Sequence, residues 1–200
     1  MAAERLDGLR VAILVASDFE QVEMTAPRQA LIDAGAVTSL IAPSAGEVQG
    51  LHHDVRGDRF PVDLTLDAAN PDDFDAVLLP GGALNADALR AQHRARAFVR
   101  RIDETDRPIA VICHGPWLLA SAGLVNGRNL TSYFTIQDDI RNAGGRWLDF
   151  PVVRDRNWVS SRCPADIPEF SREMLRLFAE YRSRRLASQA VGAAGAPHAA

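Results

Sequence analysis

The sequence predicts an α/β fold in which helices cover a mostly parallel central sheet. Short apolar runs rich in branched residues, at residues 9–16, 76–79 and 109–112, are typical of strands buried on both faces. A strand, a helix and a second strand over residues 9–42 imply a right-handed crossover and parallel strands. A sharp strand-to-helix turn at Cys113 follows the run at 109–112. These observations predict one domain organised around that turn.

Composition sets the size and class of the molecule. The 200 residues, 47% of them hydrophobic, suffice for one domain with a substantial core and are too few for two. We expect a single domain over residues 1–185. Residues 186–200 are rich in Ala and Gly without an amphipathic period, and we expect a disordered tail there. The formal net charge of -4 gives no general reason to bind nucleic acid or an anionic membrane.

Residue usage also narrows the chemistry. All 22 basic residues are arginine, which excludes a lysine Schiff base and a Walker-type phosphate lysine. The N-terminus lacks the features of a signal peptide, and no apolar run approaches the roughly 18 residues of a membrane span. Cys113 and Cys163 are too few for a secreted disulfide framework or a tetrahedral zinc set. We expect a cytoplasmic protein without a metal or a cofactor.

The first 61 residues indicate strand, helix, strand and hairpin in that order. Residues 22–34 suit a packed helix, and residues 37–42 suit a second strand. Residues 43–61 are rich in Gly, Ser, His and Asp and indicate a loop with a short hairpin. Adjacent side chains point in different directions in any regular element, so His52 and His53 favour a solvated turn over a metal site.

The rest of the chain alternates helices with short strands. We expect, in order, helices at 85–90 and 95–106, the strand at 109–112, a helix from residue 116, a strand at 130–133, a helix at 136–142, a hairpin within 152–161 and a last helix at 168–185. Gly144 and Gly145 mark the end of the helix at 136–142.

Cys113 lies between the carboxyl end of a buried strand and the start of a helix at Pro116. The same elbow presents the serine nucleophile of α/β-hydrolases. Free N–H groups and the helix dipole favour an anion there, so we expect a thiol pKa below the usual value of about 8.5. The N–H groups at His114 and Gly115 are candidate oxyanion donors. The alternative is a small buried core residue, the common role of a free cysteine.

Three loops should meet beside Cys113, because the carboxyl ends of parallel strands share one edge of a sheet. Besides Cys113 and His114, they supply Asp18, Glu20 and Glu23, together with Gly81 and Gly82, which are candidates for substrate or oxyanion contacts. A carboxyl group buried beside the cysteine has a raised pKa and can donate a hydrogen bond to a thiolate. Glutamates at a helix start can also serve only the helix dipole, but here they converge on a thiol. His114 either pairs with Cys113 or lines the pocket and needs an acidic partner from elsewhere.

Five blocks of sequence together resemble one family. The block at 110–128, which contains Cys113, closely resembles the nucleophile region of the PfpI intracellular protease branch of the DJ-1/PfpI superfamily. The other blocks agree in order and lie at 19–23, 74–82, 138–144 and 157–162. The resemblance spans about residues 10–178.

This resemblance implies a flavodoxin-like three-layer sandwich with a nucleophile elbow. It implies Cys113 as the nucleophile, Glu23 as the carboxylic acid bonded to it, with Glu20 nearby, and oxyanion contacts from Gly82 and the amide after the cysteine. It also implies a homo-oligomer, a dimer or a hexamer, in which an acidic residue of a neighbouring subunit completes a Cys-His-acid triad. By position that residue is Asp87, although the segment holds one extra residue and Asp replaces the commoner Glu.

We therefore expect a cysteine-dependent stress enzyme. Its Cys113 attacks small carbonyl compounds such as methylglyoxal, or glycated proteins, in a glyoxalase or deglycase reaction, or attacks peptides as a cysteine peptidase. The alternative is a redox sensor or chaperone in which Cys113 is oxidised without turnover. A glutaminase-type amidotransferase shares the elbow but needs a distant His and Glu pair. Cys163 departs from the family pattern. The alternatives are a second redox-active thiol and an unreactive loop cysteine, and we favour the latter because nothing near it indicates a lowered pKa.

Overall fold

Seven strands form the central sheet. The computed structural model describes residues 4–194, with side chains up to residue 188. The strands lie in the order β11 (Val152–Asp155), β12 (Trp158–Ser161), β8 (Ile109–Ile112), β7 (Ala76–Leu79), β1 (Arg10–Leu14), β3 (Val37–Ala42) and β6 (Leu64–Thr65). Only β11 and β12 pair antiparallel; the other neighbours in this sheet are parallel. The predicted mostly parallel sheet is confirmed.

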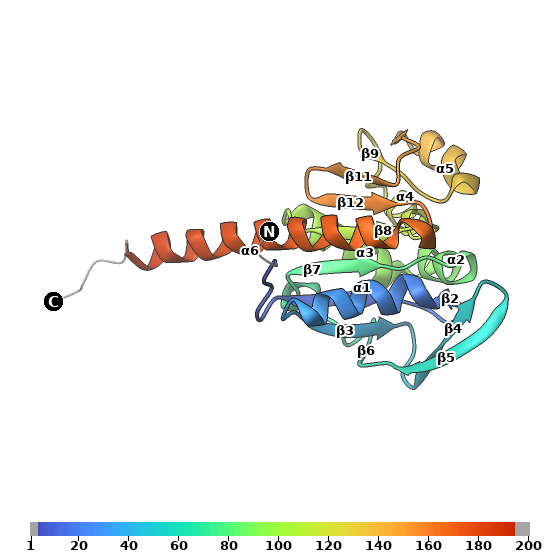
Figure 1. Cartoon of the computed structure of the whole chain (residues 1–200), viewed down its shortest axis with the longest axis horizontal. Coiled ribbons are helices and arrows are strands. Elements are labelled where there is room, and N and C mark those ends of the chain that lie inside the picture. The colour runs from blue at the N-terminus through green and yellow to red at the C-terminus, as the bar shows by residue number, and fades with distance from the viewer. Residues whose placement is uncertain (1–3, 195–200) are drawn as a thin grey trace.

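Helices cover both faces of this sheet, which makes the three layers expected from the sequence (Figure 1). They are α1 (Gln21–Asp33), α2 (Ala83–Ala91), α3 (His93–Glu104), α4 (Pro116–Ser121), α5 (Gln137–Asn142) and α6 (Ile167–Ala194), with single turns of 3-10 helix at Pro71–Asp73, Phe134–Ile136 and Pro164–Asp166. Side chains of β8 alternate between two cores: Ala110 and Ile112 pack with α1 and α6, whereas Ile109 and Val111 pack with α2, α3 and α4. The α/β flavodoxin-like fold is therefore confirmed.

The two cores hold the carboxyl edge of the sheet in place. Met24 of α1 and Phe170 of α6 are fully buried on one face, and Phe98 of α3 and Leu118 of α4 are buried on the other. Burying one side chain of this size stabilises a fold by about 1.5–3 kcal/mol. The strands between these cores are therefore a rigid support for the loops that leave them.

Two small sheets flank the carboxyl edge. One joins β2 (Phe19–Glu20), β4 (Glu47–His52) and β5 (Val55–Pro61), and the other joins β9 (Asn129–Leu130) and β10 (Arg146–Trp147). The hairpin of β4 and β5 is longer than the short one expected. Strand β9 is shorter than expected, because the N–H of Thr131 donates to Ser160 Oγ and that of Tyr133 donates to the Cys113 carbonyl, 3.0 and 2.8 Å away.

The last helix ends later than expected from the sequence. Helix α6 continues to Ala194 and extends past the edge of the sheet, where residues 186–194 were expected to be disordered (Figure 1). The expectation depended on the absence of an amphipathic period. Such a period indicates that one face of a helix is buried, but residues such as Ala, Leu and Gln favour a helix even where no face is buried. The remainder of the predicted tail, residues 195–200, lies outside the described residues. No helix in residues 4–194 combines the length and apolar character needed to cross a bilayer.

Candidate active site

The elbow at Cys113 is a strained turn held on both sides. Cys113 directly follows β8 and has φ 61°, a left-handed conformation that residues other than glycine rarely adopt. Its N–H donates to the Ser161 carbonyl at 3.0 Å, and its carbonyl accepts the Tyr133 N–H at 2.8 Å. Helix α4 begins three residues later at Pro116. The predicted strand-to-helix turn is present, and its neighbours fix the direction of the thiol.

Glu23 lies in the first turn of α1 with its side chain fully buried against this thiol. Burial, reinforced by the charge of Glu20, raises the pKa of Glu23 to about 8, although contacts with Cys113 and Gly81 act in the opposite direction. Its Oε2 accepts the Gly81 N–H at 3.0 Å. The other oxygen, Oε1, is buried without a hydrogen-bond partner among the described residues. A proton on Glu23 therefore resides on Oε1, and at pH 7 the carboxyl is mostly neutral.

The thiol itself is not acidified by its surroundings. Burial, followed by the charge of Glu23 and its contact with the thiol, raises the pKa of Cys113, and the N–H groups of Gly82 and His114 lower it by less. The expectation of a lowered pKa is therefore wrong. Helix α4 has only six residues, so its dipole is too small to offset the loss of water. Because the Glu23 charge opposes a thiolate, the thiolate forms most readily while Glu23 holds a proton.

Two of the four candidate oxyanion donors have a free N–H at the site. The N–H groups of Gly82 and His114 both lower the pKa of the Cys113 thiol, and neither donates to a backbone carbonyl of the described residues. The N–H of Gly81 is taken by Glu23, and that of Gly115 donates to the Ile112 carbonyl at 2.9 Å. Gly81 and Gly115 are therefore not oxyanion donors, contrary to the expectation. Gly81 instead allows close packing, because a Cβ there would lie 2.3 Å from Glu23 Oε2 and 2.6 Å from the Cys113 Cβ.

His114 reaches the thiol although it directly follows it in sequence. Its Nδ1 lies 3.3 Å from Cys113 Sγ, and its Nε2 lies 3.4 Å from the hydroxyl of Thr135. The ring packs between Trp117 and Tyr133, with centroids 5.4 and 5.0 Å away. Burial lowers the pKa of His114, so the imidazole is neutral at pH 7 and can accept a proton from the thiol.

A cavity of about 260 Å³ opens onto these groups. It is lined by Asp18, Glu20, Glu23, Leu51, His53, Gly82, Ala83, Leu84, Cys113, His114, Tyr133 and Pro164. Glu20 faces it from the start of α1, and its Oε2 accepts the backbone N–H of His53 at 3.1 Å. His52 and His53 are exposed at the β4–β5 turn, as interpreted from the sequence. The three loops predicted to meet at the carboxyl edge do so.

Two residues singled out in the sequence lie outside this cavity. Asp87 is exposed on α2 and does not line it. Cys163 is partly buried, and its Sγ lies 3.8 Å from Asp166 Oδ2. Neither residue contacts the thiol of Cys113 within the described chain.

Two buried amides that support the site were not recognised from the sequence. The side chain of Asn85 donates to the carbonyls of Pro80 and Gly81, at 3.1 and 2.9 Å, and accepts the Ala16 N–H at 2.6 Å. It thereby ties the loop after β7 to the end of β1. Gln21 bonds both the side chain and the backbone of Asp58, which fixes the β4–β5 hairpin over α1. Their partners are distant in sequence, so local patterns carry no signal for either role.

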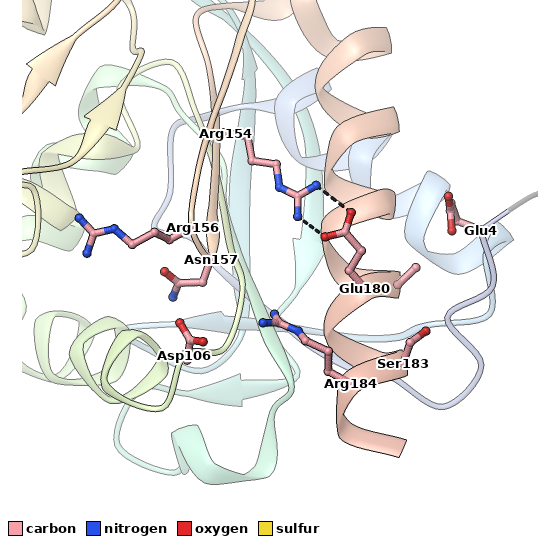
Figure 2. Close-up of a pocket in the computed structure, with 9 residues that line it drawn as sticks. Glu4, Asp106, Arg154, Arg156, Asn157, Glu180, Ser183 and Arg184 are labelled. Atoms are coloured by element: carbon pink, nitrogen blue, oxygen red, sulfur yellow. Dashed lines mark hydrogen bonds and ion pairs between the residues drawn. The ribbon is translucent and has the colours of Figure 1, made fainter. Parts of the chain in front are cut away.

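A larger cavity of about 690 Å³ lies between α6 and the β11–β12 hairpin (Figure 2). Its most prominent contact is the ion pair of Arg154 with Glu180. Its lining residues, Glu4, Asp106, Arg154, Arg156, Asn157, Ala179, Glu180, Ser183 and Arg184, include no cysteine or histidine. The smaller cavity at Cys113 is therefore the candidate active site.

Comparison with known proteins agrees with this architecture. The sequence model of the DJ-1/PfpI family matches residues 9–177. Deglycase PH1704 of Pyrococcus horikoshii and deglycase PfpI of Pyrococcus furiosus are each 41% identical over 169 residues, which cover 84% of this chain and 99% of each relative. The solved structure of DJ-1beta from Drosophila melanogaster is similar with a TM-score of 0.77 and 26% identity, over 90% of this chain and 98% of that one. The chain therefore belongs to the DJ-1/PfpI family.

Proposed function

We propose that this protein is a cysteine-dependent hydrolase of small reactive carbonyl compounds and their adducts, of the deglycase or glyoxalase type. The observation that carries the proposal is a nucleophilic thiol at a strained elbow, with a buried acid that holds a proton at neutral pH beside it. The names of the relatives at 41% identity support the same chemistry. The cavity of about 260 Å³ suits a substrate of a few carbon atoms or the modified end of one side chain.

The first step is addition of the thiol to an aldehyde carbon. The sulfur of Cys113 forms a bond to that carbon, the thiol proton moves to Nδ1 of His114, 3.3 Å away, and the carbonyl electrons move to oxygen. The developing oxyanion is stabilised by the N–H groups of Gly82 and His114. Neutral Glu23 can then donate the proton of Oε1 to this oxygen, which gives a hemithioacetal.

With methylglyoxal, the remaining steps are proton transfer and hydrolysis. A base removes the proton from the former aldehyde carbon, and a proton is returned to the neighbouring ketone carbon through an enediol, which oxidises the first carbon and reduces the second. The resulting lactoyl thioester is hydrolysed by water to lactate and free thiol. Glu23 and His114 are the groups on the cavity wall that can carry these protons.

We further propose that the enzyme is a homo-oligomer in the cytoplasm. Leu84 and Asp87 are three residues apart on one face of α2, and Leu84 is 62% exposed at the cavity rim. A second copy on this face would cover the leucine and bring a carboxylate toward the neighbouring site, as a peptidase triad needs. A reducing compartment would keep Cys113 free.

Lactate formation from methylglyoxal without glutathione tests the proposal. We expect lactate from the wild type and from Cys163→Ala, which removes the other thiol, and none from Cys113→Ala. Failure of the wild type to form lactate would refute carbonyl turnover. It would favour the redox-sensor alternative, in which protonated Oε1 of Glu23 donates a hydrogen bond to an oxidised Cys113. Mass spectrometry after mild peroxide treatment would then show whether Cys113 is oxidised.

A further inference from the structure

The walls of the Cys113 cavity carry acidic groups without balancing cations. Asp18, Glu20 and Glu23 line it, and none of its lining residues is an arginine. Lysine is absent from the whole sequence. Two histidines also line the cavity, but His114 is neutral at pH 7 because burial lowers its pKa. The side chain of His53 is 83% exposed and already faces Glu20, with Nδ1 3.6 Å from Oε2.

Asp18 lines the cavity without a cationic partner among the described residues. Its φ of 66° and the bond from its N–H to the Gln49 carbonyl, 2.7 Å long, fix the backbone. Its carboxylate forms no ion pair or hydrogen bond with the residues that the structure describes. Other partly buried carboxylates of the chain have such partners: Asp103 pairs with Arg128 and Asp166 with Arg162. An uncompensated negative charge therefore belongs to a residue of the cavity wall.

The inner wall indicates where a ligand atom is received. Glu23 is fully buried, lines the cavity, and has an Oε1 without a partner among residues 4–188. A buried polar atom of this kind normally has a hydrogen-bond partner, so Oε1 is able to bond the reacting oxygen of a substrate. That substrate would occupy the cavity that Asp18 and Glu20 also line.

We propose that this cavity selects its substrates by charge: it accepts neutral α-oxoaldehydes and carbonyl adducts of basic side chains, and it disfavours carbonyl compounds that carry a carboxylate or a phosphate. Asp18 and Glu20 are the specificity-determining residues. The inference rests on the proposed function for its substrates, while the charge selection itself concerns access to the thiol. A full charge about 6 Å from an anionic ligand, in a partly hydrated site, lowers the rate of reaction about 3- to 10-fold.

Alkylation of Cys113 tests the charge selection without turnover. Iodoacetamide and iodoacetate are similar in size and differ by one negative charge. The rate of each at Cys113 is measured by peptide mass spectrometry, and the ratio is divided by the same ratio for free cysteine. We expect the wild type to disfavour iodoacetate at least 3-fold beyond free cysteine, and Asp18→Asn to recover 3- to 10-fold of that discrimination. A higher salt concentration should also reduce the discrimination of the wild type against iodoacetate.

The control and the contradicting outcome are equally direct. Asp33→Asn removes the same charge at the other end of α1 and should leave the ratio at the wild-type value. A wild-type ratio equal to that of free cysteine, or an Asp18→Asn ratio equal to that of the wild type, would overturn the inference. Both readings are ratios at one thiol, so a change in the reactivity of Cys113 itself cancels.

Turnover separates this inference from the proposed function. The substrates are 2-oxopentanal, which is neutral, and 4,5-dioxovalerate, an α-oxoaldehyde with a carboxylate; the products are 2-hydroxypentanoate and 2-hydroxyglutarate. We expect the wild type to have a higher kcat/KM for 2-oxopentanal than for 4,5-dioxovalerate. The ratio of the first value to the second should fall 3- to 10-fold in Asp18→Asn. Equal kcat/KM for both would refute the charge selection and leave the function standing. Turnover of neither, with selective alkylation, would refute the function and leave the charge selection standing.

Discussion

Replacement of Glu23 by glutamine should make the protein more stable at neutral pH and nearly inactive. Burial raises the pKa of Glu23 from 4.5 to about 8, so the unfolded chain loses this proton at lower pH than the folded one. The stability tied to the protonated group is fully present below pH 4.5 and is lost as the pH rises toward 8. Each pH unit in this window corresponds to about 1.4 kcal/mol, so the accumulated loss at pH 7 is about 3 kcal/mol.

Glutamine has the same shape and no charge, and its oxygen can still accept the Gly81 N–H. Its free energy of unfolding should therefore not decline over this window. We expect the difference between Glu23→Gln and the wild type to grow by about 2.5 kcal/mol between pH 5 and pH 7. Turnover of methylglyoxal should fall by about 10²- to 10⁴-fold, because an amide cannot supply a proton.

Urea unfolding at several pH values, beside lactate assays, measures both effects. Glu47→Gln is the matched control, because that glutamate is 53% exposed on β4. Its stability should follow the wild type at each pH. If Glu23→Gln and the wild type show the same pH dependence of stability, Glu23 does not hold a proton at neutral pH in the folded state, and the mechanism proposed here loses its acid.

Three further predictions follow from the contacts around the thiol. The wild-type kcat/KM should decline above about pH 8, because Glu23 becomes a carboxylate there and its charge opposes a thiolate at Cys113. The rate of Cys113 alkylation by iodoacetamide should show the same pH dependence. An increase in both quantities up to pH 10 would contradict this prediction. Gly81→Ala should abolish turnover, because a Cβ would lie 2.3 Å from Glu23 Oε2 and 3.0 Å from the Ile112 carbonyl. A lactate assay that finds at least a tenth of wild-type activity in the folded variant would refute this prediction. Asn85→Ala should destabilise the fold by about 1–3 kcal/mol in urea unfolding, since it leaves buried backbone groups of the loops unpaired, and exposed Asn142→Ala should not.

The sheet and the elbow were predictable because their signals are local. Residues 109–112 are apolar and mostly branched, and Pro116 starts a helix, so strand, turn and helix follow from one short segment. The convergence of the loops followed from a general property of parallel sheets. The end of α6 was not predictable in this way, because an exposed helix rich in alanine lacks the amphipathic period used to recognise it.

The chemistry of the site was predicted only in part, because it depends on burial and on which N–H groups are free. The sequence placed Glu23 beside Cys113, but the dipole argument for an acidic thiol ignored the loss of water around it. Four N–H groups were candidates for an oxyanion, and two are used by the fold itself. Asn85 is distant in sequence from Ala16, so no local pattern identifies it as the link between their loops.

The site combines two features that a fold selected for stability alone would avoid. Glu23 is kept out of water with one oxygen unpaired, and Cys113 is kept at φ 61°. Both persist because β1, β7 and β8 are packed on both faces and do not relax around them. Between pH 4.5 and about 8, a glutamate in water is charged, so keeping Glu23 buried and protonated destabilises the folded state. In the same pH range, the proton that Glu23 holds is available for catalysis. A variant that gains stability at Glu23 and loses turnover would therefore be the direct sign that both effects have one cause.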